Sequence, residues 1–194
     1  MLKYFLVFAG GLLFSLLLTP LVRTLAVWLG AVDQPGARKV HQQPTPRLGG
    51  LAVFFAFHLT VLLGLYVFRL GDYPAPLINE YWWKGFLPAS AVIALLGVCD
   101  DIHSLGARFK FFIQVLAALV AIHFGFVIDH IVLPWGTFVK LGWFGIPITV
   151  LWIVGVTNAF NLIDGLDGLA AGIGMIASLT LADDSTGTVG RLAR

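Results

Sequence analysis

The sequence predicts an all-α, polytopic membrane protein with about six transmembrane helices. Of its 194 residues, 59% are hydrophobic and only 11% are charged, whereas a soluble domain carries about 25% charged residues. Apolar runs typical of membrane helices recur along the whole chain. The net charge of +2 and the lack of a long basic run argue against nucleic-acid binding. The single cysteine, Cys99, excludes an internal disulfide.

We expect six spans, at residues 4–22, 49–70, 85–99, 111–128, 143–160 and 169–182. The first is longer than a signal-peptide core and leads into further spans, so it is expected to stay in the protein as a helix. The third and sixth are shorter than the roughly 20 residues of a full crossing. Residues 1–182 are therefore interpreted as part of one membrane domain. Residues 183–194 are interpreted as a polar tail, either disordered or produced by truncation.

Six spans place the first, third and fifth loops on one side of the membrane. These odd loops carry six basic residues (Arg23, Arg38, Lys39, Arg47, Arg108, Lys110), against four on the other side (Lys3, Arg69, Lys84, Lys140). Positive charge favours the cytoplasmic side, so we expect these loops to be cytoplasmic and the membrane to be the plasma (inner) membrane. On the opposite side, "IVLPWGTFVKL" predicts a small hairpin, and Trp135 and Trp143 suit interfacial anchors.

Two clusters of polar side chains border apolar spans in the odd loops. Asp100 and Asp101 come where the third span is expected to end, and one of them has a simpler use as the N-cap of the next helix. A divalent cation explains both, because Mg²⁺ takes carboxylate oxygens and completes its shell with water and phosphate. The second cluster lies in "NAFNLIDGLDGLAAG", where two amides and two acids are each spaced three residues apart: Asn158, Asn161, Asp164 and Asp167. The alternative interpretation of this stretch is an ordinary polar turn between two spans.

Basic side chains accompany the carboxylates in the same loops. Phosphate transfer needs cationic groups that hold phosphates in line, and the candidates are Arg38, Lys39, His41, Arg47, Arg108 and Lys110. Taken singly, each has a simpler interpretation as a topology signal or a lipid-headgroup contact. His58 stands alone inside a span and is expected to be a hydrogen-bonded packing residue.

Three stretches, "DQPGARKVHQQPTPRLGG", "GVCDDIHSLGARFKFFIQVLAA" and "NAFNLIDGLDGLAAG", resemble the first three cytoplasmic motifs of a known family. It is the family of polyprenyl-phosphate N-acetylhexosamine-1-phosphate transferases, glycosyltransferase family 4. The resemblance runs from about residue 1 to 176, and "TPRLGG" is closer to the N-acetylglucosamine branch. It implies that a polyprenyl phosphate attacks a UDP-N-acetylhexosamine at the cytoplasmic face, with Mg²⁺ required and Mn²⁺ as an alternative. A homodimer is one arrangement open to such a protein.

The resemblance also implies roles for individual residues. Asp100 and Asp101 match the family's aspartate pair, assigned to the metal or to the lipid phosphate, and Asp164 matches its metal-binding aspartate. Asp167 matches the nearby essential acid. Asn161 and Lys110 match an active-site asparagine and a basic residue after the aspartate pair.

Family members have ten or eleven spans and a later histidine-rich loop, so the 194 residues suggest a truncated chain with little activity alone. Two rival interpretations stay open at this point. Prenyltransferases and CDP-alcohol phosphotransferases are also Mg²⁺-dependent membrane enzymes and use motifs of the form D-x₃-D. "DGLDGLAAG" lacks the arginine and the later spaced aspartates of the second group. A transport or structural subunit without enzymatic activity would be expected to place ionisable residues near mid-span.

Overall fold

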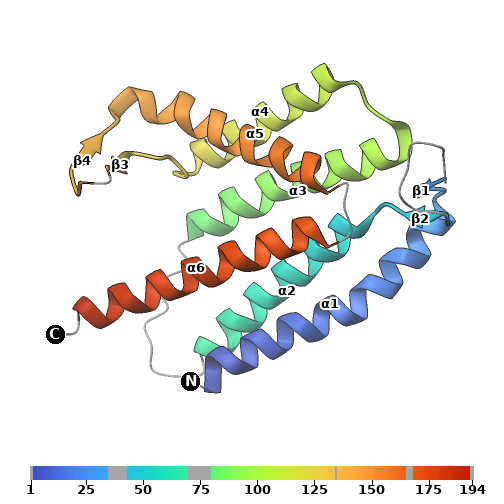
Figure 1. Ribbon diagram of the computed structural model, residues 1–194, viewed down its shortest axis with the longest axis horizontal. Coiled ribbons are helices and arrows are strands. Elements are labelled where there is room, and N and C mark those ends of the chain that lie inside the picture. The colour runs from blue at the N-terminus through green and yellow to red at the C-terminus, as the bar shows by residue number, and fades with distance from the viewer. Residues whose placement is uncertain (1, 35–42, 70–79, 134, 165–167, 193–194) are drawn as a thin grey trace. The chain divides into compact units, whose positions relative to one another are not determined.

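The structure is a computed structural model that describes residues 2–34, 43–69, 80–133, 135–164 and 168–192. Its α-helices are α1 (Leu2–Trp28), α2 (Gly49–Arg69), α3 (Glu80–His103), α4 (Ala107–His123), α5 (Gly145–Ile163) and α6 (Leu169–Leu192) (Figure 1). Each of the six expected spans overlaps one of these helices. The predicted all-α class is therefore confirmed.

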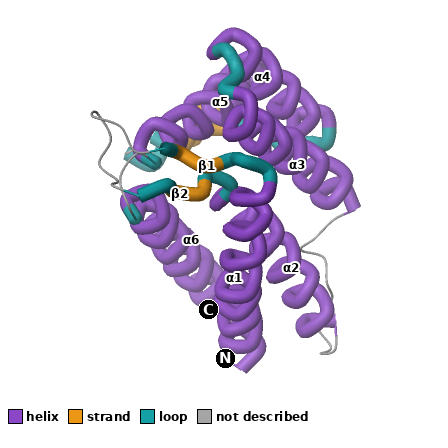
Figure 2. The backbone as a smooth tube through the Cα atoms, turned by 90° about the vertical axis from the view of Figure 1, so that its right-hand side faces the viewer, coloured by secondary structure: helices purple, strands orange, loops and turns teal. Residues whose placement is uncertain are grey.

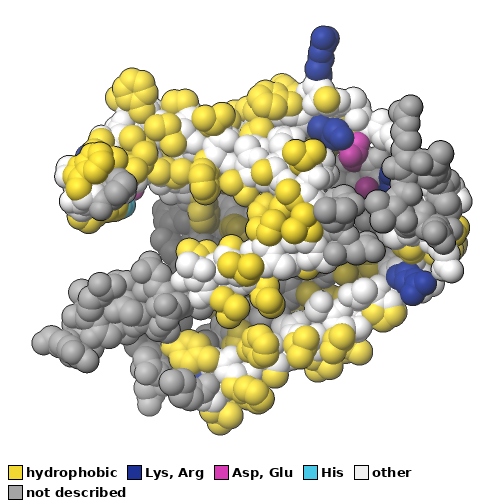
Figure 3. Space-filling model, in the orientation of Figure 1, with side chains coloured by type: hydrophobic (Ala, Val, Ile, Leu, Met, Phe, Trp, Pro, Cys, Tyr) yellow, Lys and Arg dark blue, Asp and Glu magenta, His cyan; other side chains and the backbone are white. Residues whose placement is uncertain are grey.

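Within the described ranges, four helical segments are long and apolar enough to cross a membrane: Leu2–Trp28, Gly49–Val67, Trp83–His103 and Gly142–Ile163. A shorter apolar helix covers Leu169–Leu181, and α4 has 17 residues. Large hydrophobic side chains cover much of the outer surface of the helices (Figure 3). A soluble protein rarely exposes so much contiguous apolar surface, so the chain is a polytopic membrane protein.

The chain divides into two compact units, residues 1–150 and 151–194. In the first unit, α1 packs along α2 and α3 packs along α4. Glycine permits the close approach of α1 to α2, because a Cβ atom at Gly10 would lie 2.1 Å from Cδ2 of Leu63. Small residues at such crossings are typical of helix packing in membranes.

A small buried core lies where α1 turns into the first odd loop. It consists of Val22, Ala26, Ala31, Leu48 and Ala52, with Val98 of α3 packed against it. Gly30 ends α1 with φ +72°, and the amides of residues 30 and 31 bond back to carbonyls of the last turn, which is a Schellman ending. The strands β1 (Val32–Asp33) and β2 (Thr45–Pro46) then pair antiparallel at the end of α1 (Figure 2).

The hairpin expected between the fourth and fifth spans is confirmed. Strands β3 (His130–Val132) and β4 (Phe138–Lys140) pair antiparallel, with Ile131 opposite Val139. A short 3₁₀ helix, η1 (Gly142–Phe144), leads into α5. At the base of the hairpin, the Ile128 amide donates to Oγ1 of Thr149, a buried residue of α5. The hairpin is thus tied to the helix that follows it.

Several helix boundaries differ from expectation by three to ten residues, and two of the differences concern polar segments. We expected the third span to stop at residue 99, but α3 continues to His103, so Asp100 and Asp101 lie in its last turn. We also expected a separate polar tail from residue 183, whereas α6 runs to Leu192. Once a helix is nucleated, each added residue gains a backbone hydrogen bond, so polar residues can extend an apolar helix. The domain division at residue 182 stays a prediction.

Candidate functional site

The turn between α3 and α4 is organised by the side chain of Asp100. Its Oδ1 accepts a hydrogen bond from the Leu105 amide at 2.8 Å, and its Oδ2 accepts one from Nζ of Lys110 at 3.0 Å. Both side chains are about three-quarters buried. A carboxylate beside the first amides of α4 is also favoured by the helix dipole. Asp100 therefore fixes the geometry of this turn.

The expected alternative, that an aspartate serves as the N-cap of α4, is not what the structure shows. The N-cap is Gly106, and no side chain caps it. The Asp100 side chain instead accepts from the amide of Leu105, the residue before this N-cap. The chain turns sharply at Ser104, which has φ +50°, and the Ser104 amide donates to the Asp100 carbonyl at 2.8 Å. This is an αL helix ending with serine where glycine is usual.

Asp101 is half-buried at one end of an apolar groove between α2 and α3. The groove has a volume of about 390 Å³, and the residues that line it include Leu48, Leu51, Phe54, Phe57, His58, Phe86, Ser90, Ile93 and Asp101. Leu48 and Asp101 both belong to the end near the odd loops, and His58 lies further along α2. The groove thus joins a carboxylate at the helix end to an apolar path along two spans.

His58 behaves as the sequence predicted. It is buried, its Nδ1 lies 2.8 Å from the Phe54 carbonyl oxygen, and its Nε2 lies 3.3 Å from Oγ of Ser90. The imidazole therefore links α2 to α3 as a hydrogen-bonded packing residue.

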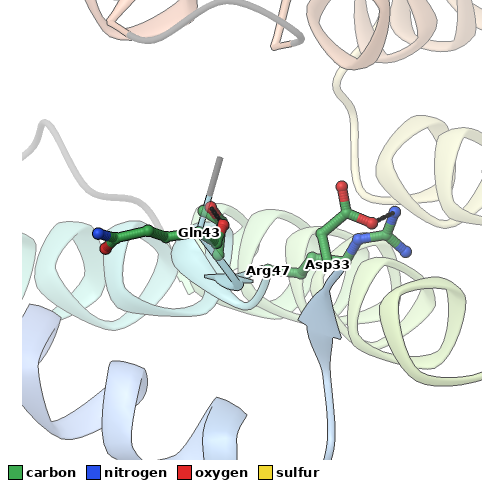
Figure 4. A network of polar contacts seen from close by, with 4 residues as sticks. Asp33, Gln43 and Arg47 are labelled. Atoms are coloured by element: carbon green, nitrogen blue, oxygen red, sulfur yellow. Dashed lines mark hydrogen bonds and ion pairs between the residues drawn. The ribbon is translucent and has the colours of Figure 1, made fainter. Parts of the chain in front are cut away.

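The first odd loop contributes an ion pair that the sequence analysis missed. Arg47 Nη2 donates to Oδ1 of Asp33 at 2.8 Å (Figure 4). The pairing of β1 with β2 brings these two residues together, since Asp33 lies opposite Thr45 in the register. The available signal was the acid that opens "DQPG" and the arginine that follows "TP", but only the strand pairing shows that they meet.

The third motif lies in the second unit, at the end of α5 and the start of α6. Nδ2 of Asn158 donates to the Val154 carbonyl of its own helix at 2.8 Å. Asn161 and Asp164 are exposed. The carbonyl of Gly168, a residue with φ +77°, accepts the amide of Gly172 in the first turn of α6. These observations place Asn161 and Asp164 on the surface of the turn.

The structure brings some of the predicted site residues together and leaves others apart or undescribed. In the first unit, Asp100 and Lys110 are brought together, Asp101 is beside them in sequence, and Arg108 is exposed in the first turn of α4. The structure pairs Arg47 with Asp33, which was not among the predicted site residues. Four predicted residues lie outside the described part of the chain: Arg38, Lys39, His41 and Asp167.

The carboxylates were tested as a metal site. Among the described residues, no group of three or more histidine, cysteine, aspartate or glutamate side chains is close enough to hold a metal ion. Mg²⁺ does not require such a cage, because it is commonly held by one or two carboxylates together with substrate phosphates and water. The carboxylates of Asp100, Asp101 and Asp164 have the chemistry that this mode requires. Both oxygens of Asp100 also accept hydrogen bonds within the turn.

Comparison with known families decides the membership of the chain. The family model described as glycosyl transferase family 4 matches residues 83–183, which is more than half of the sequence. The chain belongs to glycosyl transferase family 4. The matched segment of this family 4 chain contains the Asp100–Asp101 pair, Lys110 and the whole third motif.

Curated relatives extend the similarity over almost the whole family 4 chain. A probable undecaprenyl-phosphate N-acetylglucosaminyl 1-phosphate transferase of Bacillus subtilis is 41% identical over 184 residues, 94% of this chain and 48% of the relative. A decaprenyl-phosphate N-acetylglucosaminephosphotransferase of Mycolicibacterium smegmatis is 38% identical, over 86% of this chain and 41% of the relative. A Salmonella typhi undecaprenyl-phosphate alpha-N-acetylglucosaminyl 1-phosphate transferase is 31% identical, over 85% and 42%.

The chain spans about half the length of these curated relatives. No solved structure matches it.

Proposed function

We propose that this chain forms part of an enzyme that transfers N-acetylhexosamine-1-phosphate from a UDP-sugar to a polyprenyl phosphate. The names of the three relatives give the lipid carrier and the transferred group. Nothing among the comparisons favours a prenyltransferase, a CDP-alcohol phosphotransferase or a non-enzymatic subunit. Lipid-linked envelope glycans are the products to which such a transfer leads.

One observation carries the proposal beyond the relatives' names. Asp100 is held by Lys110 and by the Leu105 amide, and the adjacent Asp101 lies at the end of the apolar groove. A polyprenyl phosphate joins a hydrocarbon chain to a phosphate at the membrane surface. A carboxylate that meets an apolar path at a helix end is suited to chemistry on such a molecule.

The residues divide the work as follows. Asp101 in the first unit and Asp164 in the second each carry a carboxylate that would suit Mg²⁺ (or Mn²⁺), which neutralises phosphate charge when it is bound. Arg108, exposed in the first turn of α4, contacts the phosphates, and Lys110 keeps Asp100 in place. Asn161 is better suited than Asn158 to contact the sugar nucleotide, because Asn158 already bonds to its own helix.

The residues outside the described part keep the roles that the sequence suggests. Arg38, Lys39 and His41 bind phosphate, and Asp167 is the catalytic acid. Arg47 belongs with the first three by sequence, but its ion pair with Asp33 gives it a structural task in the same loop. The loops that hold these groups face the cytoplasm in the plasma membrane, where the UDP-sugar is found.

A chimera tests the proposal independently of the length of the chain. The aligned half of the Bacillus subtilis relative is replaced by this sequence, and release of UMP is followed with undecaprenyl phosphate, UDP-N-acetylglucosamine and Mg²⁺. We expect Mg²⁺-dependent release that Asp164→Asn reduces by about 10²-fold or more, because the substitution removes a charged ligand and keeps the shape.

The unmodified relative and the Leu162→Ala chimera serve as controls, since Leu162 is an exposed apolar residue two positions before Asp164. A chimera that elutes as a single species but releases no UMP, while the relative is active, contradicts the proposal. Full activity in Asp164→Asn removes that residue from the metal role.

A further inference from the structure

We propose that the β3–β4 hairpin, together with Trp143, is an anchor that lies in the lipid-headgroup region on the side opposite the odd loops. We call residues 130–143 the anchor hairpin. Its partner is the bilayer interface itself. The inference concerns a surface that takes no part in the proposed transferase site.

Both faces of the anchor hairpin expose apolar side chains. In the antiparallel register Val132 is opposite Phe138 on one face, and Ile131 is opposite Val139 on the other. All four side chains are exposed, and Phe138 is 72% exposed. A two-stranded ribbon in water would be polar on at least one face, and it is only marginally stable by itself. Because both faces expose apolar side chains, we infer that the surroundings of the strands are at least partly apolar.

The aromatic residues point to an interface in particular. Trp135 follows the first strand and is 73% exposed, and Trp143 in η1 is 90% exposed. Tryptophan is enriched at the border between headgroups and acyl chains, where its ring is buried and its N–H stays hydrated. These two side chains bracket the hairpin in the sequence and fit that environment.

The anchor hairpin continues directly into a membrane span. The apolar segment long enough to cross begins at Gly142, one residue before Trp143, so this end of the hairpin lies at the membrane border. The Leu141 amide also bonds to the Asp129 carbonyl at 2.8 Å, which closes the base of the hairpin next to that border. The lipid-facing surface of the span and the apolar hairpin are thus continuous.

The backbone limits how deep the hairpin can lie. The outer edges of a two-stranded ribbon present amide and carbonyl groups that must find water, because unsatisfied groups are costly in hydrocarbon. The polar residues gather at the base, where Nδ1 of His130 donates to Asp129 at 2.6 Å and Lys140 lies opposite His130. That hydrogen bond lowers the pKa of Asp129 from its ordinary value. A charged base and an apolar far end fit the zone about 5–10 Å deep at the headgroup boundary.

Spin labels on opposite faces of the ribbon test this placement. In the Cys99→Ser chain, Phe138→Cys and Val139→Cys are labelled one at a time after reconstitution in phosphatidylcholine and phosphatidylglycerol vesicles. Leu151→Cys on α5 reports the hydrocarbon, and Gln43→Cys in the first odd loop reports water. Collision with oxygen, which concentrates in lipid, is compared with collision with a water-soluble nickel complex.

We expect both hairpin labels to give a depth between those of the two references, with ready access for oxygen. Nickel access as high as at residue 43 would place the hairpin in water and overturn the proposal. Low access to both reagents would mean that protein covers it, a second copy or another segment, and would overturn it as well. Val132→Cys repeats the measurement on the Phe138 face if Phe138→Cys fails to fold, and circular dichroism checks the helices of every variant.

Discussion

The two ends of α4 show how differently this chain builds its two kinds of connection. At the N-terminal end, Asp100 binds Lys110 and the Leu105 amide, so polar groups satisfy one another within the turn. At the C-terminal end the chain continues into a hairpin whose apolar side chains face outward. The helix has 17 residues, which separates the two ends by about 25 Å, close to the thickness of a hydrocarbon core.

This difference indicates that the local structure of the loops, and not only their number of basic residues, carries information about which side of the membrane each loop lies on. A turn that organises carboxylates and cations is suited to phosphate chemistry in water. A hairpin with exposed aromatic residues is suited to the lipid border. The ratio of six basic residues to four in the sequence is a weak signal by itself, and the contrast between the ends of α4 is consistent with their lying on opposite sides of the membrane.

Labelling from the two sides of the membrane gives the largest expected effect. In intact cells that express the Cys99→Ser chain, Ser104→Cys should react with an impermeant maleimide only after the cells are opened. Lys140→Cys, at the polar base of the anchor hairpin, should react from outside, because α4 is expected to cross the membrane between the two positions. The measurement is the labelled fraction before and after lysis. Reaction of Ser104→Cys from outside contradicts the orientation.

Two aspartates at the two ends of α4 provide a matched comparison of activity. In the chimera, Asp101→Asn should lower UMP release by about 10²-fold, because it removes charge at the phosphate end of the groove. Asp129→Asn should leave release within about twofold, since Asp129 is exposed and bonds only to the hairpin base among the contacts shown for it. Equal losses in both variants would mean that Asp101 acts through folding. Initial rates at saturating Mg²⁺ measure both.

Lys110 in the first turn of α4 and Lys140 in β4 allow a matched comparison of stability. Lys110→Met removes the partner of a carboxylate that is about three-quarters buried, and should lower the free energy of unfolding by about 1 kcal/mol. Lys140→Met should change it by less than about 0.5 kcal/mol, because Lys140 is an exposed strand residue. Unfolding in detergent, followed by circular dichroism, tests both. A larger loss in Lys140→Met would show that the hairpin base depends on that charge.

Much of this architecture follows from the sequence because its signals are local. The apolar runs place all six helices, and the Pro-Trp-Gly segment between two β-rich stretches places the hairpin. Asp33 and Arg47 are 14 residues apart in the sequence. Their ion pair depends on two strands of two residues each, and strands this short leave no hydrophobic periodicity in the sequence. The role of Asp100 depends on the turn at Ser104, a residue that carries none of the usual glycine signal for a helix end. Only part of the site was therefore foreseen.

The smallest expected effect compares the residues that end α3 and α4. Ser104 and Gly125 both have positive φ, +50° and +92°. At Gly125 a Schellman ending forms, in which the amides of residues 125 and 126 bond to the carbonyls of residues 122 and 121.

A side chain in the left-handed region costs about 1–2 kcal/mol, and glycine loses about 0.5–1 kcal/mol more entropy on folding than alanine. Ser104→Gly should therefore raise the free energy of unfolding by about 0.5 kcal/mol, whereas Gly125→Ser should lower it by about 1 kcal/mol. The two changes exchange the same residue types in opposite directions, so their composition effects largely cancel when they are compared. Both are measured by unfolding in one detergent. If Ser104→Gly lowers stability as much as Gly125→Ser does, the serine side chain contributes a contact that outweighs its backbone strain, and the turn before α4 depends on more than Asp100.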